Sequence, residues 1–261
     1  MTTTDTTVAN AGGFRLRGYQ VTRVEALSDV VFAFALTLLG VSLGVPRTFD
    51  QLLEGMRDFP AFAICFAILI RIWHDHYRFF RHYSLEDGPT IFLNSLLLFI
   101  VILFVYCLKF LVSLWVIVLT TAGDPMARMP DGKMALIIRF AQTEWLIFIF
   151  GVGFAAVYGV FALLYFHAFQ LRDKLQLNPF EAFETRERII RYLMVCSVGL
   201  LVAGASLALG GYGARWANLT FILVPVLLIA RHSIVKRRRD KAIAEVENEK
   251  LPAGDLHEAS P

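Results

Sequence analysis

Long runs of apolar residues, separated by short polar connections, fill most of the chain. Each run is about 20 residues long, and an α-helix of that length, at a rise of about 1.5 Å per residue, crosses a hydrocarbon layer of about 30 Å. The alternation of apolar and polar residues that marks transmembrane strands does not recur. The pattern predicts an all-α, polytopic membrane protein with six transmembrane helices, at about Val24–Val45, Phe59–Phe80, Thr90–Leu119, Gln142–Phe169, Tyr192–Leu209 and Ala214–Val235.

Turn and cap residues mark the ends of these helices. Pro46 ends the first one, and the polar connection Arg47–Asp58 that follows has the residue spacing of a short surface helix. Asn178 and Pro179 are the residue types favoured at an N-cap and at the first helical position. We expect a helix that begins there and runs unbroken from an amphipathic part, Phe180–Arg191, into the fifth transmembrane helix.

Basic side chains are distributed unequally between the two ends of the predicted helices. Seventeen Lys and Arg residues flank the helices on the side of the N-terminus, and six flank them on the other side. Because cytoplasmic loops are enriched in Lys and Arg, both termini are predicted to be cytoplasmic. The chain then divides into a cytoplasmic N-terminal arm, residues 1–22, a six-helix transmembrane domain, residues 23–235, and a basic-to-acidic cytoplasmic tail, residues 236–261.

The composition agrees with a membrane protein, since 57% of the residues are hydrophobic and the mean hydropathy is +0.59. The three cysteines lie inside apolar runs, and the sequence has neither a zinc-binding spacing nor a nucleophile motif. We therefore expect no metal, no cofactor and no enzymatic activity. The polybasic run Lys236–Lys241 is typical of a segment that contacts anionic lipid headgroups, and we expect no nucleic-acid partner.

Several polar side chains are predicted to share one depth in the half of the membrane nearest the N-terminus. The second helix runs opposite to the first, so its polar residues approach the same level from the other direction. The set consists of Ser28, Asp29, Trp73, His76 and Asn94. Groups of this kind satisfy one another's hydrogen bonds, which would pin three helices together. They could instead form a proton or ion relay, or simply face water.

The segment Arg23–Leu39 resembles the signature of a known family, the endolysosomal potassium channels called transmembrane protein 175 (TMEM175). In that family an Arg is followed, after three residues, by Phe-Ser-Asp, and a Thr stands eight residues beyond the Asp in an apolar helix. The residues that match are Arg23, Ser28, Asp29 and Thr37. Leu27 replaces the Phe of the pattern. Further polar positions of the family are matched by Trp73, His76 and Asn94.

The resemblance implies a homotetramer in prokaryotes, in which the first helix of each subunit lines a central pore with a hydrophobic constriction. By register from Asp29, the constriction is Phe34, and Thr37 and Val41 are the next pore-facing layers. Leu38 lies on the same helical face, although periodicity alone is typical of a packing face. The family usually has Ile or Leu at the constriction. The larger Phe34 would close the pore more tightly or offer ring faces to a cation.

These residues and the resemblance predict a potassium-preferring cation channel in the cell membrane of a prokaryote, with potassium as the permeant ion. Arg23 would lie at the cytoplasmic mouth of the pore. Two other hypotheses stay open. One is a proton-coupled cation transporter that uses Asp29 and His76. The other is a non-conducting membrane scaffold whose basic tail binds a partner or lipid.

Overall fold

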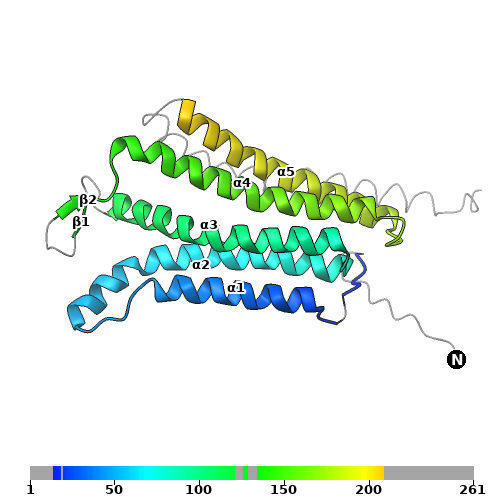
Figure 1. The fold of residues 1–261 in the computed structure, drawn as a ribbon, viewed down its shortest axis with the longest axis horizontal. Coiled ribbons are helices and arrows are strands. Elements are labelled where there is room, and N and C mark those ends of the chain that lie inside the picture. The colour runs from blue at the N-terminus through cyan, green and yellow to red at the C-terminus, as the bar shows by residue number, and fades with distance from the viewer. Residues whose placement is uncertain (1–13, 19, 121–125, 129–133, 209–261) are drawn as a thin grey trace, which may run out of the picture.

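The computed structural model describes residues 14–18, 20–120, 126–128 and 134–208. Within them the chain forms five long helices that run side by side and one small antiparallel sheet (Figure 1). The elements in chain order are α1 Arg23–Val41, α2 Phe49–Tyr83, α3 Gly88–Thr120, β1 Met126–Arg128, β2 Met134–Leu136, α4 Phe140–Gln170 and α5 Pro179–Ala208. The two strands pair in the connection between α3 and α4, where the sequence pattern predicts a loop.

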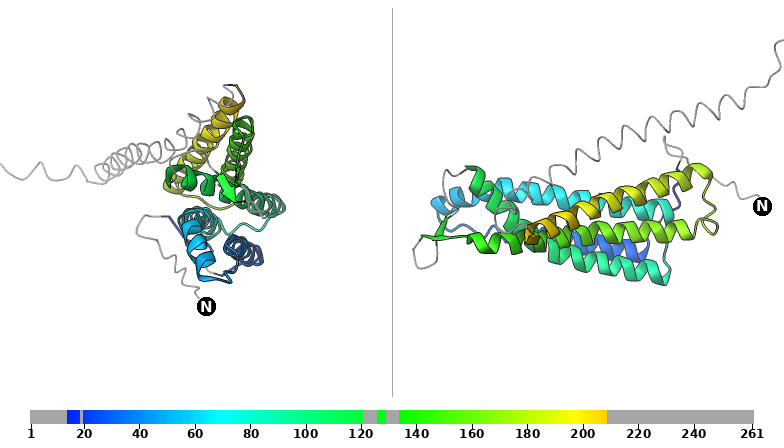
Figure 2. Two further views of the ribbon diagram at one scale, coloured as in Figure 1. Left: turned by 90° about the vertical axis from the view of Figure 1, so that its left-hand side faces the viewer. Right: turned by 90° about the horizontal axis from the view of Figure 1, so that it is seen from above.

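The helices form two packed groups. Seen from one end, α1, α2 and α3 lie together, and α4 and α5 form a closely packed pair beside them (Figure 2). The groups meet mainly where α3 packs against α4. There the ring of Phe104 fills the space above Gly153, so that a Cβ atom at Gly153 would lie only 2.9 Å from that ring.

Two glycines allow α4 and α5 to approach backbone to backbone. A Cβ atom built on Gly151 would lie 2.8 Å from the carbonyl oxygen of Gly199 and 3.0 Å from the backbone nitrogen of Ala203. A Cβ atom built on Gly199 would lie 2.9 Å from the carbonyl oxygen of Gly151. Real Cβ atoms do not reach these distances. Small residues at such crossings are the usual means by which helices pack tightly in a membrane, where the lipid supplies no hydrophobic drive.

Buried aromatic rings join the two groups at the end of the bundle where α1 begins. Phe79 of α2 lies 5.1 Å from Tyr165 of α4, and Tyr165 lies 5.3 Å from Tyr192 of α5, measured between ring centroids. The hydroxyl of Tyr83 forms a 2.7 Å hydrogen bond with Thr185 Oγ1, which links the last residue of α2 to α5. Offset and edge-on contacts between such rings stabilise a core beyond the area they bury.

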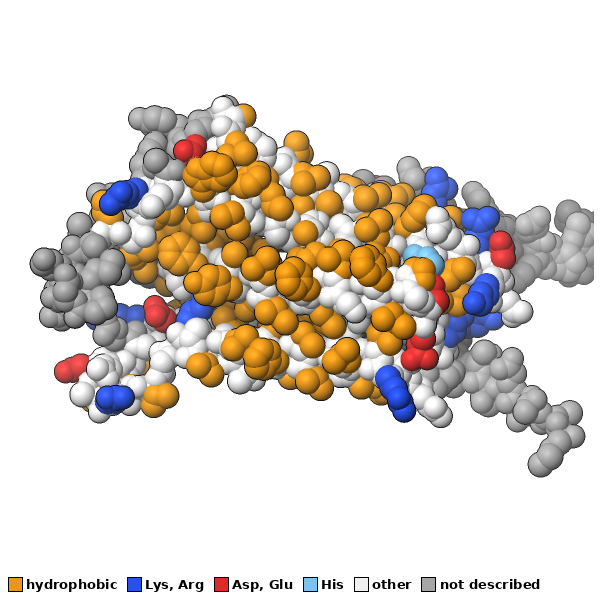
Figure 3. Space-filling view, in the orientation of Figure 1, with side chains coloured by type: hydrophobic (Ala, Val, Ile, Leu, Met, Phe, Trp, Pro, Cys, Tyr) orange, Lys and Arg blue, Asp and Glu red, His pale blue; other side chains and the backbone are white. Residues whose placement is uncertain are grey.

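A broad band of apolar side chains covers the face shown in Figure 3, and the charged side chains gather toward the two ends of the molecule. Four described helices are long and apolar enough to cross a membrane. These are α1, Gly88–Val118 of α3, Gln142–Gln170 of α4, and α5.

The prediction of six transmembrane helices is therefore wrong for the part of the chain that is described. α2 is not among the candidate spans, because its charge-free apolar part, Phe59–Ile70, covers only about 18 Å at about 1.5 Å per residue. The predicted surface helix Arg47–Asp58 and the second predicted span form one continuous helix that passes through Pro60. The predicted sixth helix, Ala214–Val235, and the tail lie outside the described residues. The arrangement of the helices gives no support to the predicted cytoplasmic position of both termini.

The local sequence signals predicted the start of α5 correctly but not the end of α1. α5 begins at Pro179, as predicted, and the side chain of Asn178 accepts a 2.7 Å hydrogen bond from the backbone nitrogen of Glu181. α1 ends at Val41 rather than Val45, because Ser42 caps it. The ammonium of Lys109 on α3 donates a 2.7 Å hydrogen bond to the carbonyl oxygen of Ser42 and also contacts its hydroxyl. A cation at a helix C-terminus is favoured by the helix dipole.

The α4–α5 contact predicts a large effect of one methyl group. Gly151→Ala should lower the free energy of unfolding by about 1–3 kcal/mol, because the backbone of α5 must move to admit the new Cβ atom. Gly204→Ala on α5 is the matched control, since a Cβ atom there meets no described residue within 4 Å. It should leave stability unchanged or raise it by up to about 1 kcal/mol. Thermal unfolding of the purified protein in detergent measures both. Equal midpoints for the two variants would contradict the close approach.

Candidate functional site

α1 has two distinct faces. Its buried face consists of Ser28, Phe32, Ala35 and Leu39, which are at most 2% exposed and pack toward α2 and α3. The spacing of four, three and four residues places them on one side of a helix. The other side of α1 points out of the subunit. Among the described residues nothing covers it.

The outward face of α1 carries the residues predicted to line a pore. Phe34 is 54% exposed, Leu38 44% and Val41 71%, and Thr37 is also exposed. Leu27 and Val30 continue the stripe toward the start of the helix, where Arg23 is exposed as well. The structure thus brings Phe34, Thr37, Leu38 and Val41 together on one surface. Arg23 lies at the end of that surface and not within it.

Thr37 is the polar member of the stripe. Its hydroxyl donates a 2.9 Å hydrogen bond to the carbonyl oxygen of Ala33, one turn back along the helix. The hydroxyl proton is therefore directed at the helix, and the oxygen lone pairs are left to face outward. An exposed oxygen of this kind can accept a hydrogen bond from water or contact a cation.

A buried chain of hydrogen bonds connects the other face of α1 to α3 and α2. The amide Nδ2 of Asn94 donates to Ser28 Oγ at 2.9 Å, and Asn94 Oδ1 lies 2.8 Å from His76 Nε2. Because Asn94 Oδ1 can only accept, His76 Nε2 is the donor. Ser28 Oγ in turn donates to the carbonyl oxygen of Val24 at 2.8 Å. All three side chains are at most 1% exposed.

Trp73 and Asp29 form a separate contact at the edge of this chain. The indole Nε1 of Trp73 donates a 2.8 Å hydrogen bond to Asp29 Oδ1, and Asp29 is exposed. An indole has one donor and no acceptor, so the proton path ends there. In the described part of the chain no hydrogen bond joins Asp29 to His76. Among the described residues, the five polar side chains therefore form two hydrogen-bonded sets, of three and of two members.

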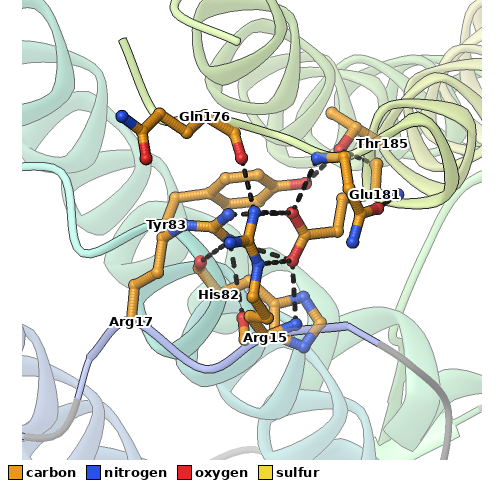
Figure 4. Close-up of polar contacts among 8 residues, drawn as sticks. Arg15, Arg17, His82, Tyr83, Gln176, Glu181 and Thr185 are labelled. Atoms are coloured by element: carbon orange, nitrogen blue, oxygen red, sulfur yellow. Dashed lines mark hydrogen bonds and ion pairs between the residues drawn. The ribbon is translucent and has the colours of Figure 1, made fainter. Parts of the chain in front are cut away.

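The pattern analysis missed a second polar site, where the N-terminal segment is attached to α5 (Figure 4). The side chain of Glu181 is fully buried and forms ion pairs with Arg17 at 2.8 Å and with Arg15 at 3.0 Å. The backbone nitrogen of Arg15 donates to the same carboxylate at 2.8 Å. We call Phe14–Gly18 together with Glu181 the arm clamp.

The arm clamp also holds on to the end of α2. Phe14 stacks on the ring of His82 at 4.3 Å, and the backbone nitrogens of Arg17 and Gly18 donate to the carbonyl oxygen of Arg81 at 3.1 and 3.2 Å. Gly18 is required for this approach, because a Cβ atom there would lie 2.9 Å from the carbonyl oxygen of Phe80. The sequence signals for the arm clamp are limited to an Arg-x-Arg pattern near the N-terminus and an acidic residue three positions after Asn178. Neither identifies the other as its partner.

Comparisons with known proteins agree on one family. A family model described as "Endosomal/lysosomal potassium channel TMEM175" matches residues 23–104. A curated potassium channel of Marivirga tractuosa is 36% identical over 253 residues, which cover 90% of this chain and 96% of that protein. A potassium channel of Chamaesiphon minutus is 34% identical over 87 residues, which cover 30% of this chain and 43% of that protein.

Solved structures show the same relationship. The crystal structure of the potassium channel MtTMEM175, in complex with a nanobody–MBP fusion protein, aligns with a TM-score of 0.75 and 34% identity, over 88% of this chain and 100% of that one. The crystal structure of a lysosomal potassium-selective channel TMEM175 homologue from Chamaesiphon minutus aligns with a TM-score of 0.52 and 22% identity, over 80% of this chain and 96% of that one. At that identity the second structure supports the fold alone.

The buried hydrogen-bond chain predicts that Asn94→Ala is strongly destabilising. The change leaves His76 Nε2 without its acceptor and removes the donor to Ser28 Oγ, and an unsatisfied buried group costs about 1–3 kcal/mol. The neighbouring Ser95→Ala is the control, since Ser95 is exposed and bonds only to the carbonyl oxygen of Ile91 in its own helix. Thermal unfolding in detergent should separate the two variants. If both unfold at the wild-type temperature, the chain does not hold α1 in place.

The arm clamp predicts that Glu181→Gln releases the N-terminal segment. Hydrogen bonds to a charged group contribute about 1.5–3 kcal/mol, so trypsin should cleave after Arg15 and Arg17 roughly tenfold faster in the variant. Glu86→Gln serves as the control, because Glu86 is exposed and is not part of the clamp. Mass spectrometry of the digest identifies the cleaved bonds. Unchanged cleavage rates in the Glu181 variant would mean that the clamp does not hold the arm.

Proposed function

Because this chain belongs to the TMEM175 family of potassium channels, we propose that it is a potassium-preferring cation channel of the cell membrane and that α1 lines its pore. The observation that carries the proposal is the outward face of α1. It offers a row of large apolar side chains and one hydroxyl that the described part of the subunit leaves uncovered. Four copies of the subunit around one axis would enclose these faces, so the proposed assembly is a homotetramer.

In this assembly Phe34 forms the hydrophobic constriction. Rings from four subunits would meet on the axis and exclude water from a short section of the pore, and such constrictions gate by dewetting. The ring faces also carry negative potential, which attracts a cation that passes close to them. The closure of the pore would then depend on small rotations of α1, because a half-exposed ring on a helix surface moves sideways when the helix turns.

Thr37 supplies the polar layer of the proposed pore. It lies three residues beyond Phe34, about 4.5 Å further along the axis at the rise of an α-helix. Four threonine oxygens with outward lone pairs would replace part of the hydration shell of a potassium ion. Val41 and Leu38 would form the apolar wall next to that layer. Arg23 would lie at the pore mouth at the other end of α1.

The buried chain through Ser28, Asn94 and His76 would keep the pore helices in register. Residues that shape a site work best when their own supports are fixed by packing and hydrogen bonds. The contact of Trp73 with Asp29 would add a second support nearer the surface of the subunit. In this reading the polar belt, which consists of Ser28, Asp29, Trp73, His76 and Asn94, positions α1 and carries no ion itself.

Ion flux in liposomes tests the proposal. Vesicles that contain the purified protein should pass potassium faster than sodium, and Phe34→Ala should raise the leak several-fold because the constriction is removed. Phe166→Ala on α4 is the control, since Phe166 is 48% exposed and lies on a helix outside the proposed pore. It should leave the flux unchanged.

Two results would overturn the channel. One is a stable tetramer with no flux above that of empty vesicles. The other is a Phe34→Ala protein that is less stable but passes no more ions, which is the outcome expected of a non-conducting scaffold. Crosslinking of a cysteine placed at Phe34 tests the geometry directly, because four copies on an axis should form disulfide-linked dimers between subunits.

A further inference from the structure

Three arginines from two helices gather at the end of the bundle where α1 begins. Arg78 lies on α2, and Arg188 and Arg191 lie on α5. Arg188 donates a 3.4 Å hydrogen bond to the hydroxyl of Tyr165. The ring of Tyr165 packs against Phe79, the residue next to Arg78, at 5.1 Å between centroids. The hydrogen bond between Tyr83 and Thr185 brings the two helices together beside them. Like charges on separate elements cost free energy unless a group of opposite charge lies between them.

The carboxylates near this cluster already have partners. Asp75 lies 2.8 Å from Arg71, Glu184 lies 3.2 Å from Arg188, and Glu181 is held by the arm clamp. Arg78 and Arg191 form no ion pair in the part of the chain that the structure describes, and both are half-buried. Among the described residues Arg191 donates a single hydrogen bond, a long one of 3.4 Å to the hydroxyl of Tyr192.

Arg188 is the most buried member of the cluster, with 4% of its surface exposed. One of its Nη groups contacts Glu184 and the other lies 3.4 Å from the hydroxyl of Tyr165. Its Nε has no hydrogen-bond partner among the described residues, although it is buried. A buried, unsatisfied donor on a guanidinium costs free energy, and an anion that approached the cluster would satisfy it.

The cluster lies at the edge of the apolar band. The sequence of α5 has no charged residue from Tyr192 to Ala208, directly after Arg191. On α2 the charge-free stretch Phe59–Ile70 ends just before Arg71. Charged side chains begin on both helices at the same end, which is the level at which lipid headgroups meet a membrane protein. Leu193 and Leu200 of α5, 52% and 56% exposed, continue from the cluster into the band, where acyl chains would lie.

We propose that Arg78, Arg188 and Arg191 bind the phosphate group of an anionic phospholipid. A guanidinium presents its N–H donors in a planar fork that fits phosphate oxygens two at a time, and in the proposed site Arg78 and Arg191 would offer such forks from two helices while Arg188 offers its unpaired Nε. The lipid would neutralise the surplus positive charge and connect α2 to α5. This site is separate from the proposed pore, and its test does not depend on ion conduction.

The test measures lipid-dependent stabilisation of the purified protein in detergent. Phosphatidylglycerol should raise the unfolding temperature more than phosphatidylcholine does. Arg78→Gln and Arg191→Gln should each raise the phosphatidylglycerol concentration needed for half of the effect about fivefold. Arg186→Gln is the matched control, because Arg186 is exposed on another face of α5. Arg188 is not substituted in this experiment, because its removal would leave Glu184 without its ion-pair partner.

A further measurement distinguishes a lipid headgroup from free phosphate as the ligand. Inorganic phosphate at millimolar concentration should stabilise the wild type little if a lipid is the ligand, and as much as phosphatidylglycerol if the site takes free phosphate. Arg191→Lys keeps the charge but loses the fork, and should fall between wild type and Arg191→Gln. The site is refuted if phosphatidylglycerol, phosphatidylcholine and phosphate act alike on the wild type. An equal loss in Arg186→Gln also refutes it, because any surface charge would then suffice.

Discussion

A buried hydrogen-bond chain from Ser28 through Asn94 to His76 sets the rotation of α1, and the surface that the subunit presents depends on that rotation. One residue of shift turns an α-helix by about 100°, which would break the bond from Asn94 to Ser28 and bury other side chains of α1 in place of the present ones. The buried apolar residues of α1 are Phe32, Ala35 and Leu39, and their burial requires the same rotation of the helix. The buried hydrogen bonds and the apolar packing therefore specify the same rotation of α1.

The second group of helices, α4 and α5, is held together in a different way. α4 and α5 contact each other through their backbones at Gly151 and Gly199, so the fit is set by shape and not by polar groups. The aromatic rings of Phe79, Tyr165 and Tyr192 then connect this pair to α2 at one end only. The subunit combines a three-helix group held by buried hydrogen bonds with a two-helix group held by close contact.

Much of the helical structure could be predicted because its signals are local. The predicted bounds of α3 and α4 lie within two residues of the observed ones, and Asn178 and Pro179 mark the start of α5. The end of α1 was missed because the helix stops at the Ser42 cap, whose carbonyl oxygen is bonded by Lys109 far along the chain. The members of the polar belt could be chosen by depth along each helix. Their pairing could not, since depth does not tell whether His76 reaches Asp29 or Asn94. The arm clamp depends on a contact that no local pattern encodes.

The arm clamp has a consequence for the order of events during synthesis. Arg15 and Glu181 are 166 residues apart in the chain, and the carboxylate is made long after the arginine has left the ribosome. α1, α2 and α3 are neighbours in sequence and can pack first, as domains built from the N-terminus commonly do. The segment that precedes α1 gains its attachment only when the fifth helix arrives. A truncated chain that ends before Pro179 would thus keep the polar belt but would lack the carboxylate that holds the segment before α1.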